Sequence, residues 1–131
     1  MYLYHGSANK NLTKLIPQKI TIRIKGDPAY VFATNSMELA LTHMLRSDDS
    51  WVGSGRINKV HYIIISDKEK FVRSDTGGAI YKFLDDGFIV TDPTHPSEYT
   101  STISVKPISK TTYPNCLDAL LDNSVQVFFC Q

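Results

Sequence analysis

The sequence predicts a compact α+β fold, a mostly antiparallel split sheet of about seven strands with two or three short helices. Three observations support this. Short β-branched and aromatic runs recur along the 131 residues, and Gly, Pro or Asp bounds most of them. Helical spacing of apolar residues occurs in only two stretches, near residues 36–45 and 114–121. Hydrophobic residues make up 42% of the chain and charged residues 21%, as in ordinary globular proteins.

The first predicted strand covers residues 1–7 and ends in His5-Gly6-Ser7. A glycine at a strand end permits close approach of a ligand or of another backbone, and histidine titrates near neutral pH. Residues 12–16 form one turn or an extended segment over the core. The strict polar–apolar alternation over residues 19–25 predicts a strand with one basic, solvated face.

Residues 29–34 are aromatic and β-branched, and they predict a strand that runs directly into a helix. Asn35 is the expected N-cap, because Glu38 follows it at capping-box spacing. Apolar residues then recur at the spacing of one helical face: Met37, Ala40, Leu41, Met44 and Leu45. His43 falls on the more exposed flank of this helix.

The second half of the chain alternates loops and strands. Residues 47–58 are interpreted as a loop in which Trp51 covers a pocket or, in the favoured interpretation, anchors the loop to the core. Residues 60–65 predict a central strand, and residues 67–70 a charged turn. Further strands are expected over 79–84 and 88–90, which would pair as a hairpin, and over 98–105 and 125–129. Between the last two, Pro114 starts a short helix with Leu117, Leu120 and Leu121 on one face.

Composition limits the function. The formal net charge of +1 demands neither nucleic acid nor an anionic membrane as a partner. Cys116 and Cys130 are too few for a disulfide framework, so we expect two reduced thiols. The four histidines do not have metal-ligand spacing. No signal segment opens the chain, and no apolar run approaches the ~20 residues of a membrane helix. We therefore expect a cytoplasmic protein without a membrane partner.

Three short motifs point to a family. His5-Gly6-Ser7 resembles the first motif of the ADP-ribosyltransferase fold, in its diphtheria-toxin and poly-ADP-ribose-polymerase branch. The strand over 29–34 and its helix are similar in type and order to the second motif, and Glu98-Tyr99-Thr100-Ser101 looks like the third, a Glu that opens a late strand. The motifs span residues 2–107. The chain also resembles small bacterial or phage-type domains that open with Leu-Tyr-His-Gly-Ser.

The resemblance implies one ADP-ribosyltransferase-like domain over residues 1–131. It implies that NAD is the substrate, that nicotinamide is released and that ADP-ribose passes to an unknown protein or nucleic-acid target. Glu98 and His5 would be the catalytic residues, since a carboxylate stabilises the positive ribosyl centre that nicotinamide leaves behind. The residues implied to bind NAD are His5, Gly6, Ser7, Tyr30, Phe32 and Thr34. The family's tyrosine position aligns with Val31, so a bulge must shift the register or the ring contact must come from elsewhere.

Two other functions compete with this one. A small toxin-type ribonuclease could use His5, His95 and Arg56 as acid, base and phosphate ligand, although the near-zero net charge counts against it. A non-catalytic module of the same fold would bind a protein or a nucleotide, and the misaligned second motif supports this alternative. Structural interpretations compete as well: His5 bonded to the backbone at a strand end, Glu98 as an exposed residue after a loop, and Thr34 as a helix cap.

Overall fold

The protein has an α+β fold with mostly antiparallel sheets, as predicted. The structure, a computed structural model, describes residues 1–18, 29–45 and 51–130, so the strand predicted over 19–25 lies outside the described residues. A five-stranded sheet contains, in spatial order, β6 (Glu98–Ser101), β2 (Val31–Thr34), β1 (Tyr2–Ser7), β5 (Gly78–Leu84) and β7 (Ser109–Tyr113). A three-stranded sheet contains β3 (Val52–Ile57), β4 (Val60–Ile65) and β8 (Gln126–Phe129). Only the β4–β8 pair is parallel among these strands.

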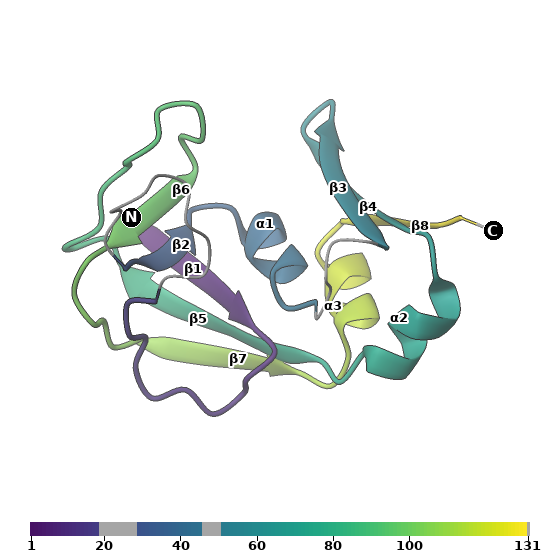
Figure 1. Ribbon diagram of the computed structural model, residues 1–131, viewed down its shortest axis with the longest axis horizontal. Helices are drawn as coiled ribbons and strands as arrows, with labels where there is room; N and C mark the ends of the chain where they lie inside the picture. The colour runs from purple at the N-terminus through teal and green to yellow at the C-terminus, as the bar shows by residue number, and fades with distance from the viewer. Residues whose placement is uncertain (19–28, 46–50, 131) are drawn as a thin grey trace.

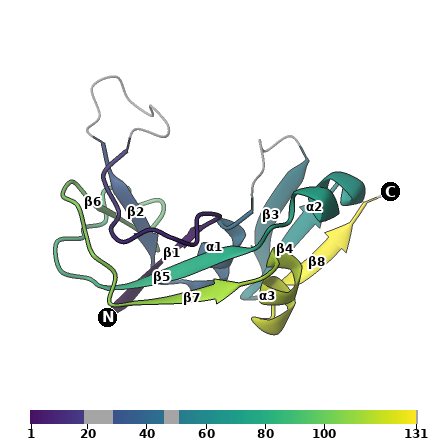
Figure 2. The same ribbon diagram turned by 90° about the horizontal axis from the view of Figure 1, so that it is seen from below.

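The helices are α1 (Met37–Thr42), α2 (Lys68–Ser74) and α3 (Cys116–Asp122). Helices α1 and α3 lie between the two sheets, and α2 lies at the end of the three-stranded sheet (Figure 1). The view from below shows β1, β5 and β7 running together while β2 diverges upward from them (Figure 2). The five-stranded sheet is thus split between β1 and β2, which pair only at Tyr4 and Thr34.

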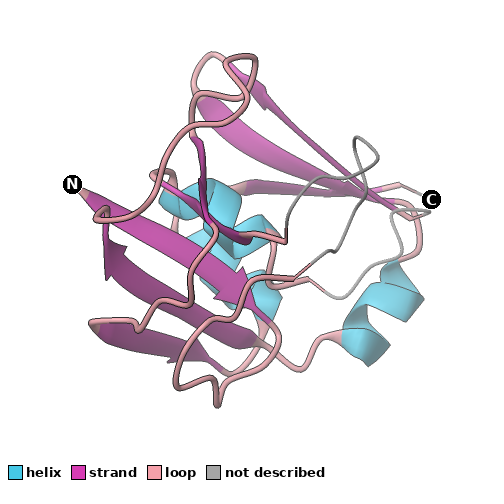
Figure 3. Ribbon diagram, turned by 60° about the vertical axis from the view of Figure 1, so that its left-hand side comes forward, coloured by secondary structure: helices cyan, strands magenta, loops and turns pink. Residues whose placement is uncertain are grey.

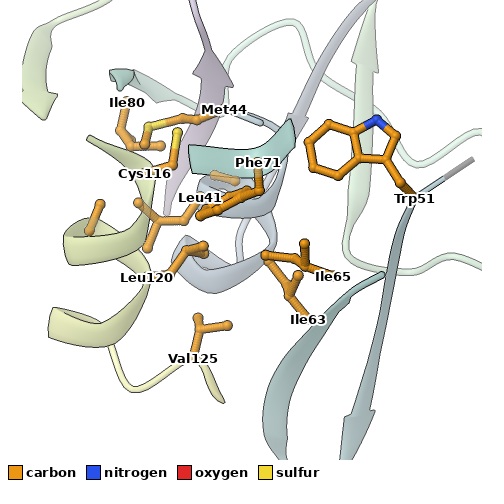
Figure 4. Close-up of a cluster of buried hydrophobic side chains, with 12 residues drawn as sticks. Leu41, Met44, Trp51, Ile63, Ile65, Phe71, Ile80, Cys116, Leu120 and Val125 are labelled. Atoms are coloured by element: carbon orange, nitrogen blue, oxygen red, sulfur yellow. The ribbon is translucent and has the colours of Figure 1, made fainter. Parts of the chain in front are cut away.

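Two clusters of buried side chains hold the fold together. The inter-sheet core joins α1 and α3 to the inner face of the three-stranded sheet, and Figure 4 shows its central residues, among them Leu41, Ile63, Ile65, Phe71 and Leu120. The second cluster, here called the outer core, lies on the opposite face of the five-stranded sheet. Figure 3 shows long loops that cross this sheet. It contains Leu3, Leu15, Val31, Ala33, Ala79, Tyr81, Phe83 and Phe88.

Several predicted elements are confirmed. The segment over residues 12–16 is extended, because Leu15 forms an antiparallel bridge with Val105 and contributes to the outer core. Trp51 is 6% exposed and its ring meets Phe71 edge-on with centroids 6.4 Å apart, so it anchors the core. Cys116 and Cys130 are both free thiols.

The loop predicted over residues 47–58 is wrong from Val52 onward, because strand β3 begins there. The two-residue turn at Asn58 and Lys59, with φ of 51° and 66°, joins β3 to β4 in a tight hairpin. The two glycines of β3 hide this strand in the sequence. Across the hairpin, the ring of Tyr62 covers the face of Gly55 that a Cβ would occupy.

The charged turn predicted over 67–70 is the start of α2. Asp67 is its N-cap, with Oδ1 accepting a hydrogen bond from the Lys70 backbone N–H at 2.9 Å. The N-cap of α1 is Ser36 and not Asn35, because Ser36 Oγ accepts from the Leu39 N–H at 3.3 Å. Each helix begins where a side-chain oxygen reaches a free backbone N–H.

The remaining corrections concern strand pairing. Residues 88–90 are not the hairpin partner of β5, whose neighbours are β1 and β7; Ile89 makes only an isolated bridge to Thr100. Strand β7 has no counterpart in the sequence prediction, because its side chains are mostly exposed and carry no apolar alternation. Strand β6 ends at Ser101, well before residue 105. In α3, Leu120 is buried but Leu121 is 53% exposed.

Candidate functional site

The three strands that carry the family-like motifs lie side by side, in the order β6, β2, β1. Thr34 at the end of β2 pairs with Tyr4 of β1 on one side and with Glu98 of β6 on the other. The chain therefore brings the end of β2 and the start of β6 next to the middle of β1, just before His5 (Figure 1).

The sheet splits beside His5. Strands β1 and β2 pair only at Tyr4 and Thr34, whereas β1 and β5 pair at six positions from Tyr2 to Ser7. At the split, Nδ1 of His5 lies 2.7 Å from the backbone oxygen of Phe32. A carbonyl oxygen only accepts hydrogen bonds, so Nδ1 carries the hydrogen. The other ring nitrogen, Nε2, is then an acceptor whenever His5 is neutral.

The electrostatic setting favours this neutral form. Burial lowers the pKa of His5 below its ordinary value, and the bond to the Phe32 carbonyl opposes this by favouring the protonated ring. Burial is the larger cause, so His5 is mainly a neutral acceptor at pH 7. Such a group accepts a hydrogen bond from a hydroxyl, for example that of a ribose.

A folded loop positions Glu98 at the start of β6. Asp92 accepts hydrogen bonds from the Thr94 hydroxyl at 2.6 Å and from the Thr94 N–H at 3.0 Å, and its Oδ2 lies 2.9 Å from Nδ1 of His95. The bonds to Thr94 and His95 lower the pKa of Asp92 to about 2. The Glu98 N–H then donates to the His95 carbonyl at 3.1 Å, which sets the point where the strand begins.

His5 and Glu98 do not face each other directly. Side chains paired across a sheet share a face, and neighbours along a strand alternate. Through Thr34, Glu98 therefore shares the face of Tyr4, which packs against the inter-sheet core. His5 starts on the opposite face, where its ring lies 6.5 Å from that of Tyr81.

A second histidine, His43, lies at the C-terminal end of α1. It caps the C-terminus of α1 on the face of the sheet that Glu98 shares. The pKa of His43 is lowered by burial and by the nearby His5 charge, and the Glu98 carboxylate raises it. His43 is exposed on the flank of α1, as its helical position predicts.

The aromatic residues of the second motif divide between the two faces. Phe32 alternates to the face of Thr34 and Glu98, and the ring of Tyr30 meets it edge-on with centroids 5.8 Å apart. Val31 is 3% exposed in the outer core and pairs regularly with Ser101, so no bulge shifts this strand. An aromatic surface for a flat ring would therefore come from Phe32 and Tyr30.

Three of the proposed NAD-binding residues have structural partners. The face of Gly6 is closed by the Ala40 carbonyl of α1, so the close approach is that of another backbone. Ser7 Oγ accepts from the Asn9 N–H at 3.0 Å in the turn after β1. Thr34 Oγ1 accepts from the Ser36 N–H at 3.1 Å, next to the N-cap of α1.

The ribonuclease residues are not brought together. Arg56 lies in β3 of the three-stranded sheet, paired with His61, and His95 lies in the loop before β6. Figures 1 and 2 both place β3 and β6 at opposite ends of the molecule. Among the described residues there is no group of three His, Cys, Asp or Glu that could hold a metal ion. None of the described helices has the length and apolar character needed to cross a membrane.

In comparisons with known proteins, no family model, no curated protein and no solved structure matches this chain.

Proposed function

We propose that the protein is an NAD-dependent ADP-ribosyltransferase-like enzyme, which releases nicotinamide and transfers ADP-ribose to a protein or nucleic-acid target. The observation that carries the proposal is the register through Thr34, which pairs on one side with Glu98 of β6 and on the other with Tyr4 of β1, the residue before His5. These three strands are distant in sequence and are brought together only by the fold.

The chemistry of the site supports the same reaction. Departure of nicotinamide leaves positive charge on the ribosyl carbon, and the Glu98 carboxylate would stabilise it. Neutral His5 offers Nε2 as an acceptor for a ribose hydroxyl, because Nδ1 is bonded to Phe32. Phe32 and Tyr30 supply aromatic surface on the Glu98 face.

The test is release of labelled nicotinamide from NAD, with water or an added polypeptide or RNA as acceptor. Glu98→Gln keeps the shape of the side chain and removes its charge, so the rate should fall about 10²- to 10³-fold. Glu69→Gln, on the exposed surface of α2, is the matched control and should keep the parent rate.

Calorimetric titration with NAD completes the experiment, since it detects binding without turnover. The proposal fails if the protein neither binds NAD nor releases nicotinamide. It also fails if Glu98→Gln and Glu69→Gln have the same rate, because the carboxylate would then play no part.

A further inference from the structure

Tyr81 lies directly across from His5 on the neighbouring strand. The two residues are paired in the antiparallel register of β1 and β5, so their side chains share the outer face of the sheet. Their rings meet with centroids 6.5 Å apart and an angle of 52° between the planes, within the range of an aromatic contact. A side-chain contact therefore links Tyr81 to the candidate site.

The ring of Tyr81 is held in place along its whole length. The residue is 0% exposed and belongs to the outer core, where close packing restricts the side chain to one rotamer. Its hydroxyl, at the far end of the ring, donates to the Asn9 carbonyl at 2.6 Å and accepts from the Leu12 N–H at 3.0 Å. The ring thus presents a fixed surface to His5.

The orientation of the His5 ring is defined by contacts with the strands on either side of β1. From β2, the Phe32 carbonyl accepts the hydrogen of Nδ1 at 2.7 Å. From β5, the Tyr81 ring contacts the imidazole. A single hydrogen bond tolerates a range of angles, and the contact with a buried ring narrows that range. Nε2 then keeps one direction, as a group that positions a substrate must.

We propose that Tyr81 is a positioning residue of the site, whose ring holds the His5 imidazole in the orientation in which Nε2 accepts a substrate hydroxyl. The inference rests on the proposed function, in which that hydroxyl belongs to a ribose of NAD. Tyr81 acts through His5 and touches no substrate itself, because it is fully buried. Its hydroxyl has a separate structural role, the attachment of the loop that follows β1.

The experiment uses variants that remove different parts of Tyr81. Tyr81→Phe loses the hydroxyl and keeps the ring, so it should lose stability and keep the parent kcat/KM for nicotinamide release. Tyr81→Leu loses the ring, and kcat/KM should fall about 10²-fold, because misplacement of a positioned group by about 1 Å has an effect of this size. Phe83→Leu is the matched control. Phe83 lies on the same strand and in the same cluster but pairs with Leu3, so this variant should keep the parent kcat/KM.

Combination with His5→Gln separates positioning from a general loss of structure. Because Tyr81 acts through His5, Tyr81→Leu should cause no further fall in kcat/KM once His5 is replaced. A general loss of structure would lower kcat/KM by the same factor in both backgrounds, and that result overturns the inference. An equal fall in Tyr81→Phe and Tyr81→Leu overturns it too, because the ring would then not be the part that matters.

NMR spectroscopy tests the His5 ring without NAD. In the parent protein near neutral pH, the ring nitrogen resonances of His5 should show one tautomer, with the hydrogen on Nδ1. In Tyr81→Leu the pKa of His5 should rise towards its ordinary value, because burial is the main cause of its lowering, and in Phe83→Leu it should be unchanged. Exchange between two tautomers in the parent protein overturns the inference, even where Tyr81→Leu does not fold.

This inference and the proposed function fail by different results. A protein that releases nicotinamide, and whose Tyr81→Leu variant keeps the parent kcat/KM, overturns this inference alone. A protein that neither binds NAD nor releases nicotinamide overturns the proposed function and this inference with it.

Discussion

The two sheets differ in how their faces are covered. The central strands β1 and β5 of the five-stranded sheet are buried on both faces, with Leu3 and Phe83 in the outer core and Ile80 in the inter-sheet core. The three-stranded sheet is buried on one face only. Ile63 and Ile65 point inward at 0% exposure, whereas Ile64 and Phe128 point outward at 39% and 51%.

The difference shows where polar residues are informative. The outer face of the three-stranded sheet is an open hollow of about 450 Å³ lined mainly by apolar side chains. In the five-stranded sheet, burying a titratable side chain costs free energy unless the side chain is hydrogen-bonded. A titratable residue at such a position is therefore a stronger sign of function than one on an exposed face. The hydrogen bond from His5 to the Phe32 carbonyl offsets this cost. It holds the His5 ring at the split between β1 and β2.

The largest difference between the two sheets is expected when a large aromatic side chain is removed from each. Phe83→Ala empties a site in the outer core and should lower the free energy of unfolding by about 3 to 5 kcal/mol. Phe128→Ala removes an exposed ring from β8 and should cost less than about 1 kcal/mol. Urea denaturation measures both, and equal losses would contradict the difference in coverage.

A matched pair of glycines tests the contact between α1 and β1. In Gly6→Ala the new methyl group overlaps the Ala40 carbonyl, and overpacking of this kind costs about 1 to 3 kcal/mol, with the upper end expected because backbone must move. Gly53→Ala in β3 meets nothing within 4 Å and should change stability by less than about 0.5 kcal/mol. Thermal unfolding of the two variants measures both effects. A Gly6→Ala variant as stable as the parent would contradict the close approach of α1 to β1.

The loop over the outer core depends on one hydroxyl. Tyr81 donates to the Asn9 carbonyl at 2.6 Å and accepts from the Leu12 N–H at 3.0 Å. Tyr81→Phe should therefore cost about 1 to 2 kcal/mol, because both backbone groups lose their partner. Tyr62→Phe on the open face is the control and should be close to neutral in the same urea titration, since its hydroxyl has no hydrogen bond to the described residues.

The lowered pKa of His5 predicts a pH dependence of stability. The unfolded chain takes up the proton first, near pH 6.5, so the folded state loses stability as pH falls from about 6.5 towards the lower folded pKa. Unfolding free energies at about pH 7.5 and pH 5.5 measure the loss. His5→Gln should show a smaller difference between the two, and an unchanged difference would mean that other groups cause it.

The smallest effect concerns the two thiols, which differ in their surroundings. Burial, and then the Asp75 charge, raise the pKa of Cys116 to about 12, and its sulfur lies in the inter-sheet core. Cys130 is exposed after β8. Alkylation of the native protein near pH 8 should label Cys130 alone by mass spectrometry, and both thiols after unfolding. Equal labelling of the native protein would show that the core opens readily.

Residues of the site differed in how far the sequence could place them. His5, Gly6 and Glu98 were found from short motifs, and α1 from its apolar spacing. The sheet face that each of them occupies was not predictable. The faces of His5 and Glu98 depend on the pairing of Tyr4 with Thr34 and of Thr34 with Glu98. No local pattern contains that information.

The sequence by itself determined the elements whose signal is local: the apolar, β-branched runs of β4 and β5, the helical face of α1 and the strand end at His5. Tertiary structure alone decided β3, β7 and the face on which each site residue lies. Strands β3 and β7 carry glycines or exposed polar side chains, so backbone pairing with β4 and β5 holds them, and that pairing is non-local. Which side chains share a face depends on register, and register is set by residues far apart in the chain.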